Sequence, residues 1–335
     1  MKAALSALAV EVGQGKSVGS SGSVSAAITA FIEHRKAEGA LAPSTVVVYE
    51  SSLDRINGTD LATKALSKVQ PYDVEQAINR LRAEGAGPYV LSQCHRLIRA
   101  AMNQAVAWGW ITRNPVLRGT GPRLPQKRVE APTADQVLRV VEELAINSPD
   151  TSLIVMLGAI TGLRRGALCG LRWSDIDGDR IVIRRSLVLA GKEIVERPPK
   201  MRAEGEFEEL DLGDAEQVIL RKIRALQMER AAQAGSTLPE DGWIYSSDGV
   251  GGSPRRPDYL TKTLSSAGKA VGVKISPHDL RHFAATVMLS QGIDVGTVAR
   301  RLHHRDPALT LRVYDHPDAE RARAAGETVS KALGV

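Results

Sequence analysis

The sequence predicts a mainly α-helical protein with a small antiparallel β-sheet, built as an N-terminal helical bundle followed by a C-terminal α+β domain. Residues 23–112 repeat apolar side chains at helical spacing and contain no convincing strand. Residues 179–189 alternate apolar and polar side chains, which indicates a strand. Between these regions, residues 113–130 are rich in proline and arginine, as expected of a segment that joins two domains. A chain of 335 residues is long enough for two domains.

The N-terminal region is expected to contain four helices. Residues 1–22 form a Gly- and Ser-rich tail, and residues 23–112 form the bundle. The first helix covers residues 23–38 and the second begins at Pro43, whereas the third begins at Pro71 and ends before Gly85. The fourth runs from Pro88 to Trp110. Four amphipathic helices of this length predict a small helical bundle.

The segment 113–130 is the predicted linker, and it is strongly basic. No acidic residue lies between Thr112 and Arg128. One interpretation is a solvated linker that its prolines make semi-extended. The other is a cationic strap along a phosphate backbone. The candidate DNA contacts in this segment are Arg113, Arg118, Arg123, Lys127 and Arg128.

Residues 131–335 form the predicted second domain. Thr133 is expected to cap a helix over residues 135–146, and the nearly apolar segment 151–160 predicts a buried helix. A strand over 179–189 is followed by strands near residues 192–197 and 206–212, with Lys200 at the tip of the hairpin between the last two. The remainder reads as helices over residues 214–233, 256–271, 278–292, 295–302 and 308–314, and a final segment covers residues 317–333.

Composition and charge narrow the class of protein. Hydrophobic residues make up 43% and charged residues 24%, as in soluble globular proteins, and no apolar run is long enough to span a membrane. No secretory signal is recognisable, and Cys94 and Cys169 are expected to be buried reduced thiols, so the protein is expected in the cytoplasm. The net charge of +6 favours a polyanionic partner.

Two segments resemble ligand motifs without satisfying them. The sequence GQGKS at residues 13–17 has Val10 where a phosphate-binding loop requires glycine, and no strand precedes it. The sequence HDLRH at residues 278–282 spaces two histidines like those of a zinc hydrolase. Arg281 shares their helix face, however, and a fixed cation there opposes a divalent metal. We therefore expect neither a cofactor nor a metal.

A set of cations and hydrogen-bond donors is more informative. His278 and Arg281 are one helical turn apart, which suits a pair that grips a phosphate. Such a set, without acids at matching positions, can stabilise a pentacoordinate phosphorane by charge while a tyrosine attacks as a covalent nucleophile. The members are Arg164, Lys200, His278, Arg281, His304 and Tyr314.

In this order, these residues resemble the tyrosine site-specific recombinases, specifically the phage-type integrases. The segments that carry the resemblance are TGLRRGALCGLRWSDID at 161–177, PK at 199–200, HDLR at 278–281 and LHHRDPALTLRVYDH at 302–316. The resemblance implies that residues 23–112 are a core-binding (SAM-like) domain and that residues 131–335 are the catalytic domain. It also implies a DNA strand transferase that needs neither metal nor ATP.

The resemblance implies a role for each site residue. Tyr314 would form a 3′-phosphotyrosyl link, while Arg164 and Arg281 would hold the non-bridging phosphate oxygens. Lys200 would protonate the leaving 5′-oxygen. His278 would assist proton transfer, and His304 would bond the phosphate.

Three positions depart from the family pattern. Ala167 stands where an acidic residue usually follows the first arginine, and His303 replaces the glycine of a Leu-Gly-His motif. Several glutamates follow Lys200, where the family loop is usually more basic. None of the departures removes a catalytic group, so we expect activity.

The family also implies partners. These are double-stranded attachment sites, a tetrameric synaptic complex to which a C-terminal helix (317–333) docks, and a directionality factor or host DNA-bending protein. No arm-binding domain is expected before the bundle. The leading hypothesis is integration or excision of a phage or mobile element in the cytoplasm of a bacterial host. The alternatives are a chromosome-dimer resolvase of the same family, a catalytically weakened DNA-binding relative and a zinc hydrolase.

Overall fold

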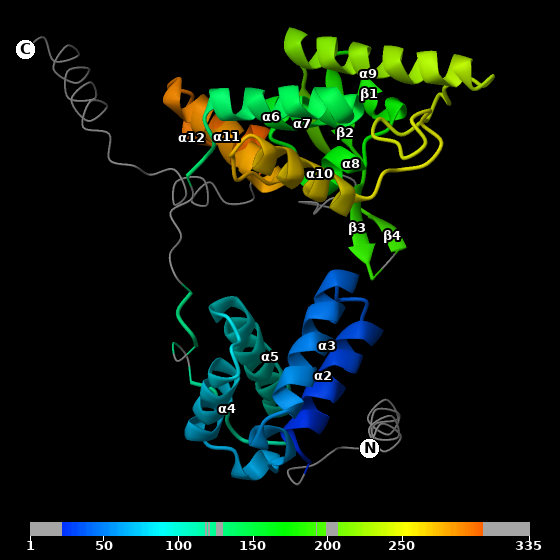
Figure 1. Cartoon of the computed structure of the whole chain (residues 1–335). Coiled ribbons are helices and arrows are strands. Elements are labelled where there is room, and N and C mark those ends of the chain that lie inside the picture. The colour runs from blue at the N-terminus through cyan, green and yellow to red at the C-terminus, as the bar shows by residue number, and fades with distance from the viewer. Residues whose placement is uncertain are drawn as a thin grey trace, which may run out of the picture. The chain divides into compact units, whose positions relative to one another are not determined.

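The computed structural model describes residues 22–117, 119, 121–124, 130–191, 193–198 and 207–303. They fold as two compact units, which are described separately below. The first holds helices α2 to α5 and the second holds helices α6 to α12 with short antiparallel strands, so the predicted fold class is confirmed (Figure 1).

The described residues of the first unit form a bundle of four α-helices. They are α2 (Val24–Ala37), α3 (Pro43–Asn57), α4 (Pro71–Ala83) and α5 (Pro88–Ala107). Ser23 caps α2 by accepting a hydrogen bond from the amide of Ala26, and each of the other three helices begins with proline, whose missing amide costs nothing there. The four predicted helices are therefore confirmed, and two short 3₁₀ turns, η1 (Asp60–Thr63) and η2 (Leu66–Lys68), separate α3 from α4.

Helix α5 contacts the other three helices of this bundle through a largely apolar face. Leu97, Ile98 and Met102 are buried on that face and belong to a core that includes Ile28 of α2 and Ile56 of α3. Burial of this face supplies most of the helix stability, since helices in proteins are stabilised mainly by tertiary packing.

The segment after α5 continues to pack on the bundle. Val116 is 4% exposed and belongs to the apolar core, and the side-chain amide of Asn114 donates to the backbone carbonyl of Arg99 at 3.0 Å. The first part of the segment predicted as a linker thus lies against the bundle, because an apolar side chain and an amide find partners there.

The second unit is built around α7 (Pro149–Thr161). Ile154, Val155 and Leu157 are fully buried, as the apolar sequence predicts. Helix α6 (Ala134–Asn147) lies beside it and begins at a reciprocal cap between Thr133 and Gln136. The helices that follow are α8 (Arg165–Cys169), α9 (Asp214–Gln233), α10 (Pro257–Ala270), α11 (Pro277–Ser290) and α12 (Val295–Arg301).

Among the residues that the structure describes, five short strands form two sheets. Strands β1 (Ile176–Asp177), β2 (Arg180–Ile183) and β5 (Glu208–Asp211) form an antiparallel sheet in the order β1-β2-β5, with Ile181 opposite Leu210 and Ile183 opposite Glu208. Strands β3 (Ser186–Ala190) and β4 (Glu193–Arg197) form a separate two-stranded sheet. A 3₁₀ turn, η3 (Trp173–Asp175), immediately precedes β1.

Two predictions about these strands are wrong. The single strand expected over residues 179–189 is interrupted at Arg184 and Arg185, and its two halves join different sheets. The hairpin expected between the strands near residues 192–197 and 206–212 is not formed, because β4 pairs with β3 whereas β5 pairs with β2. Lys200 itself lies outside the described residues.

The other expectations for this unit are mostly confirmed. The predicted helix 214–233 coincides with α9, and the next three helices agree to within two residues at each end. The segments 308–314 and 317–333 lie outside the described residues. Cys94 and Cys169 are buried and free, and burial raises the pKa of Cys169 to about 12. None of the described helices has the length and apolar character needed to cross a membrane.

Candidate functional site

Arg164 is placed by a tight turn between α7 and α8. Helix α7 ends at Gly162, which has φ +65°, and Arg164 precedes α8 with extended backbone. A Cβ atom on Gly162 would lie 2.4 Å from a methyl carbon of Leu302, so only glycine fits both the conformation and the space. The turn therefore brings Arg164 next to the end of α12.

Arg281 comes to the same place from the first turns of α11. That helix begins at a cap in which the Asp279 carboxylate accepts from the amide of Ser276 at 2.8 Å. Arg281 is only 4% exposed and donates to the carbonyl of Gly162 at 2.8 Å and to the carbonyl of Leu302. These two bonds fix the guanidinium against the turn that carries Arg164.

Arg164 is held more loosely and is more accessible. Its side chain is 48% exposed, its Nη2 donates to the carbonyl of His303 at 2.7 Å, and its Nη1 lies 3.6 Å from the carboxylate of Glu208. A guanidinium has five N–H donors, so these contacts leave donors for an anion. The structure thus brings Arg164 and Arg281 together at the backbone carbonyls of residues 302 and 303.

His278 lies one turn before Arg281 on α11. Its ring reaches the surface, yet the pKa of His278 is lowered. The main cause is partial desolvation, and the second is the positive charge of Arg281. Its ring meets that of His282 edge-on, with centroids 4.3 Å apart, and burial lowers the pKa of His282 to about 4. Both imidazoles are therefore neutral at pH 7, and each keeps one donor and one acceptor nitrogen.

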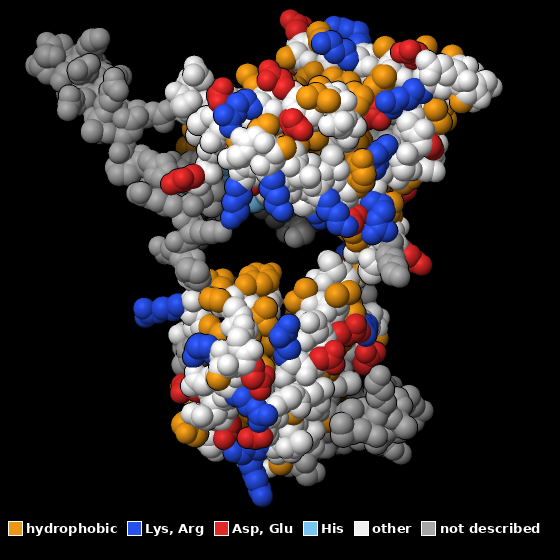
Figure 2. Space-filling view, in the orientation of Figure 1, with side chains coloured by type: hydrophobic (Ala, Val, Ile, Leu, Met, Phe, Trp, Pro, Cys, Tyr) orange, Lys and Arg blue, Asp and Glu red, His pale blue; other side chains and the backbone are white. Residues whose placement is uncertain are grey.

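Other cations surround this site. Arg165 donates to the hydroxyl of Thr261 on α10 at 2.8 Å, and Figure 2 shows lysine and arginine side chains along the edge of the second unit near α10 and β3. Within the part of the chain that the structure describes, no three His, Cys, Asp or Glu side chains form a group that could hold a metal. What the described site offers is a cationic surface with oriented donors, which suits an anion such as a phosphate.

The remaining predicted residues divide into two groups. Arg113 and Arg123 are described and exposed. Lys200, His304, Tyr314, Arg118, Lys127 and Arg128 lie outside the described residues. His303, the last described residue, has φ +51°, so it adopts the left-handed conformation that the glycine of the related motif favours.

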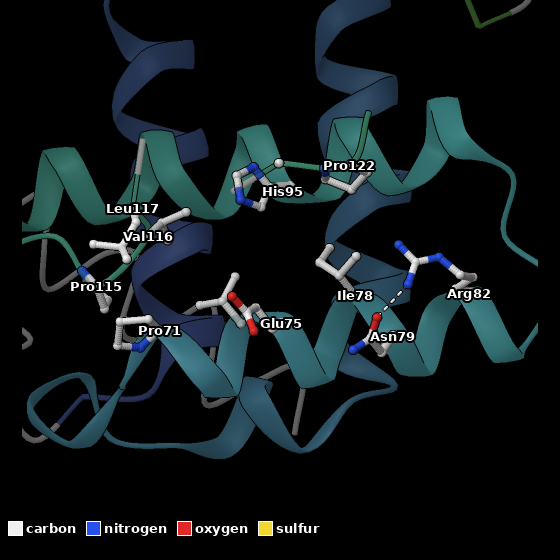
Figure 3. Close-up of a pocket in the computed structure, with 12 residues that line it drawn as sticks. Pro71, Glu75, Ile78, Asn79, Arg82, His95, Pro115, Val116, Leu117 and Pro122 are labelled. Atoms are coloured by element: carbon white, nitrogen blue, oxygen red, sulfur yellow. Dashed lines mark hydrogen bonds between the residues drawn. The ribbon is translucent and has the colours of Figure 1, made fainter. Parts of the chain in front are cut away.

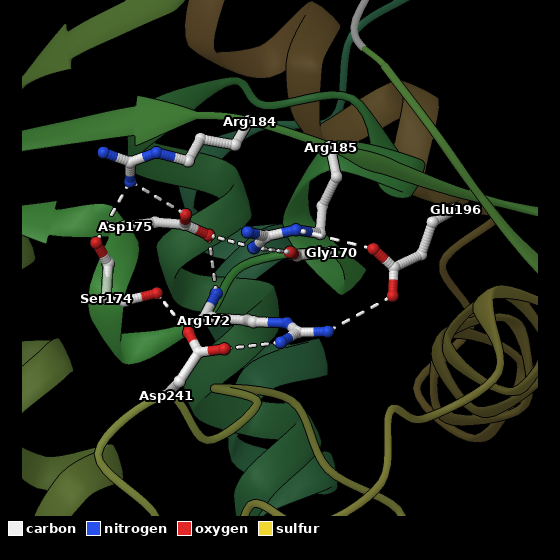
Figure 4. A network of polar contacts seen from close by, with 8 residues as sticks. All are labelled: Gly170, Arg172, Ser174, Asp175, Arg184, Arg185, Glu196 and Asp241. Atoms are coloured by element: carbon white, nitrogen blue, oxygen red, sulfur yellow. Dashed lines mark hydrogen bonds and ion pairs between the residues drawn. The ribbon is translucent and has the colours of Figure 1, made fainter.

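A buried acid that the sequence analysis did not single out braces the neighbouring strands (Figure 4). Asp175 is fully buried and accepts from Arg185 at 2.6 Å, from Arg184 at 3.1 Å and from the backbone amide of Arg172 at 2.8 Å. Arg172 reaches Glu196 of β4 at 3.2 Å. This network ties the turn after α8 to both sheets.

A cavity of about 260 Å³ lies in the first unit, between α4, α5 and residues 115–122 (Figure 3). Its lining includes Glu75, Arg82 and the nearly buried His95, and Arg82 donates to Asn79 across its rim. Of the predicted site residues that the structure describes, none lines this cavity.

Comparison with known proteins identifies the family of this chain. A family model described as "Phage integrase family" matches residues 130–321. The tyrosine recombinase XerC-like protein of Caldanaerobacter subterraneus subsp. tengcongensis is 24% identical over 312 residues, which cover 86% of this chain and 78% of that protein.

Many solved structures share the fold, and two integrases are examples. The Tn1549 transposon integrase in complex with transposon right end DNA has a TM-score of 0.72 and 16% identity, covering 91% of this chain and 99% of that one. A lambda integrase tetramer bound to a Holliday junction has a TM-score of 0.64 and 19% identity, covering 86% and 76%. Because the family model covers more than half of the sequence, the chain belongs to the phage integrase family and is an enzyme of the tyrosine recombinase class.

Proposed function

We propose that this enzyme cuts and rejoins DNA at specific sites through a 3′-phosphotyrosyl intermediate on Tyr314, without metal or ATP. The observation that carries the proposal is the convergence of Arg164 and Arg281 on one turn, where both guanidinium groups are held by backbone carbonyls. Two guanidinium groups held at one turn can bind the two non-bridging oxygens of a phosphodiester. Charge that is oriented before the reaction stabilises a pentacoordinate transition state without reorganisation.

The proposed reaction has two transesterification steps, and the energy of the phosphodiester bond is retained in the phosphotyrosyl ester. The Tyr314 oxygen forms a bond to phosphorus, the 5′-oxygen leaves, and Lys200 supplies its proton. A 5′-hydroxyl of the partner strand then attacks the phosphotyrosyl ester and releases Tyr314. Because one ester replaces another, the exchange requires no nucleotide hydrolysis.

Neutral His278 fits the proton transfers that this sequence needs. A phenol has an ordinary pKa of about 10, so attack at pH 7 requires both a proton acceptor and nearby positive charge. The lowered pKa of His278 keeps a nitrogen lone pair available, and the arginines supply the charge. In the proposal, His304 adds a hydrogen bond to the phosphate.

We assign residues 23–112 to core-site binding, residues 113–130 to the connection and residues 131–335 to catalysis. The basic residues of the connection, Arg113 and Arg123 among them, are assigned to phosphate contacts. Replacing both with glutamine should reduce the slope of log Kd against log salt by about 2. Arg180, which is paired with Glu209 and Asp211, provides the control, because its replacement should leave the slope unchanged.

The biological role proposed is integration or excision of a phage or mobile element in the cytoplasm of a bacterial host. The transposon and lambda integrases of similar fold support that role. The Xer-type relatives favour chromosome-dimer resolution as the second candidate. Assembly into a tetramer through residues 317–333 is part of the proposal. Deleting the chain after Asp318 should then abolish tetramers on DNA and leave binding intact.

The decisive experiment mixes wild type or Tyr314→Phe with DNA flanking the protein's own gene, in EDTA, and resolves covalent adducts on a denaturing gel. An adduct that forms only with wild type supports the mechanism, and an adduct on a chromosomal dimer-resolution site alone favours the second candidate. Specific binding with no adduct would refute the mechanism and leave a DNA-binding relative.

A further inference from the structure

The contact between Arg164 and Glu208 is the starting point. Arg164 precedes α8, and the residue one helical turn later, Ala167, is 7% exposed and bears only a methyl group. Helix α8 therefore supplies no acid to orient the guanidinium. The carboxylate that lies 3.6 Å from its Nη1 comes from a different element, strand β5.

The register of β5 explains why this carboxylate points to the site. Glu208 pairs with Ile183 of β2, and successive side chains of a strand lie on opposite faces. Leu210, on the same face as Glu208, is 3% exposed, and the side chain of Glu208 itself is 19% exposed. Glu209, on the other face, is 50% exposed and pairs with Arg180.

The position of β5 is itself fixed to the end of α12. Arg301 donates to the carbonyl of Asp211 at 3.1 Å and to the buried carboxylate of Glu216 at 2.6 Å. The carbonyl of His303, two residues after Arg301, holds the other side of the Arg164 guanidinium. The contacts of Arg301 therefore fix the positions of Glu208 and of this carbonyl relative to each other.

We propose that Glu208 is a positioning residue that orients Arg164 for the scissile phosphate. This inference rests on the proposed function. Glu208 touches neither the phosphate nor the tyrosine in this role. It holds Nη1 while the carbonyl of His303 holds Nη2, so that the remaining donors of Arg164 face the phosphate. Without the carboxylate, the exposed guanidinium would sample other directions.

The test is a double-mutant cycle with Arg164→Lys, read out by single-turnover adduct formation on nicked DNA that traps the adduct, and by DNA binding. Glu208→Gln should slow adduct formation by roughly tenfold to a hundredfold, since misplacement of a catalytic group by about 1 Å has effects of that size. The Kd should stay within about twofold or tighten, because a negative charge is removed from the DNA-binding surface. In the Arg164→Lys background, Glu208→Gln should change the rate by less than about twofold.

Glu209→Gln is the matched control, because it removes a glutamate from the opposite face of the same strand and should keep the wild-type rate. A wild-type rate in Glu208→Gln overturns the inference, and a faster rate would mean that Glu208 competes with the phosphate. An equal loss in both backgrounds also overturns it, since Glu208 would then act through another group or through folding. If wild type forms no adduct at all, the proposed function fails. If wild type forms the adduct and Glu208→Gln shows a wild-type rate, a faster rate or an equal loss in both backgrounds, only the inference is refuted.

Discussion

Gly162→Ala tests whether the turn before α8 sets both stability and catalysis. The new Cβ atom would lie 2.4 Å from a methyl carbon of Leu302 and 3.3 Å from the Cβ of Ala284. Leu302 is fully buried and packs with Ala285 and Val298, so its side chain can move away from the new methyl group only by displacing its neighbours. The backbone at +65° is also unfavourable for any residue with a side chain.

The expected loss of stability follows from these two effects. The left-handed conformation costs an alanine about 1–2 kcal/mol, part of which is offset because alanine loses less entropy than glycine on folding. Overpacking adds about 1–3 kcal/mol. We therefore expect Gly162→Ala to lower the free energy of unfolding by about 2–4 kcal/mol.

The control is Gly178→Ala, which separates the two effects. Gly178 has φ +59°, and a Cβ atom added there would have no neighbouring atom within 4 Å. Its replacement carries only the conformational cost, so the loss should be about 1 kcal/mol or less. Urea unfolding of the full chain measures both variants.

The substitution should also impair the reaction. The carbonyl of Leu302 accepts from Arg281 and that of His303 accepts from Arg164, so a shift of Leu302 moves both guanidinium groups. Adduct formation by folded Gly162→Ala should fall roughly a hundredfold, and Gly178→Ala should retain the wild-type rate. Equal stability losses in the two variants would show that Leu302 relaxes freely. A normal adduct rate in destabilised Gly162→Ala would refute the role of the carbonyls.

Three further predictions concern residues near the site. His303→Gly should raise the urea midpoint by the equivalent of about 0.5–1 kcal/mol, because φ +51° is unstrained for glycine; a lower midpoint would mean that imidazole contacts outweigh the strain. The folded pKa of His282, about 4, lies below the unfolded value, so its contribution to stability is complete above about pH 6.5 and is lost as the pH falls toward 4. His282→Gln should remove a slope of at most about 1.4 kcal/mol per pH unit from urea-derived stabilities in that interval, and identical slopes would contradict the assignment. Asp175→Asn should cost about 3–5 kcal/mol, against less than about 1 kcal/mol for the exposed Asp241→Asn, and similar urea midpoints would show that the buried network is not stabilising.

The helices could be predicted from sequence because their signals are local. Apolar spacing, proline at the first helical position and caps such as Thr133 all lie within the helix they define. The strands could not be placed as well, since pairing is a non-local property. The break between β2 and β3 depends on Arg184 and Arg185 reaching Asp175, which lies in an earlier turn. Nothing in the local pattern of residues 179–189 indicates that partner.

The site also divides into residues that the sequence predicts and contacts that it does not. Arg164, His278 and Arg281 could be selected from sequence because their residue types and order carry the resemblance. Their partners could not, because Arg164 and Arg281 bind carbonyl groups that every residue possesses. The only sequence signal for Glu208 was the alternation of β5, which puts it on the face of buried Leu210.

The carbonyl partners also explain why the change at position 303 is compatible with an intact site. The group of His303 that binds Arg164 is its backbone oxygen, whose position depends on φ and ψ and not on the side chain. Histidine reaches the left-handed conformation at φ +51° more readily than a β-branched residue does, at a cost of about 1 kcal/mol relative to glycine. Histidine in place of glycine at position 303 therefore lowers the folding stability. The two guanidinium groups nevertheless keep the carbonyl partners that the proposed reaction needs.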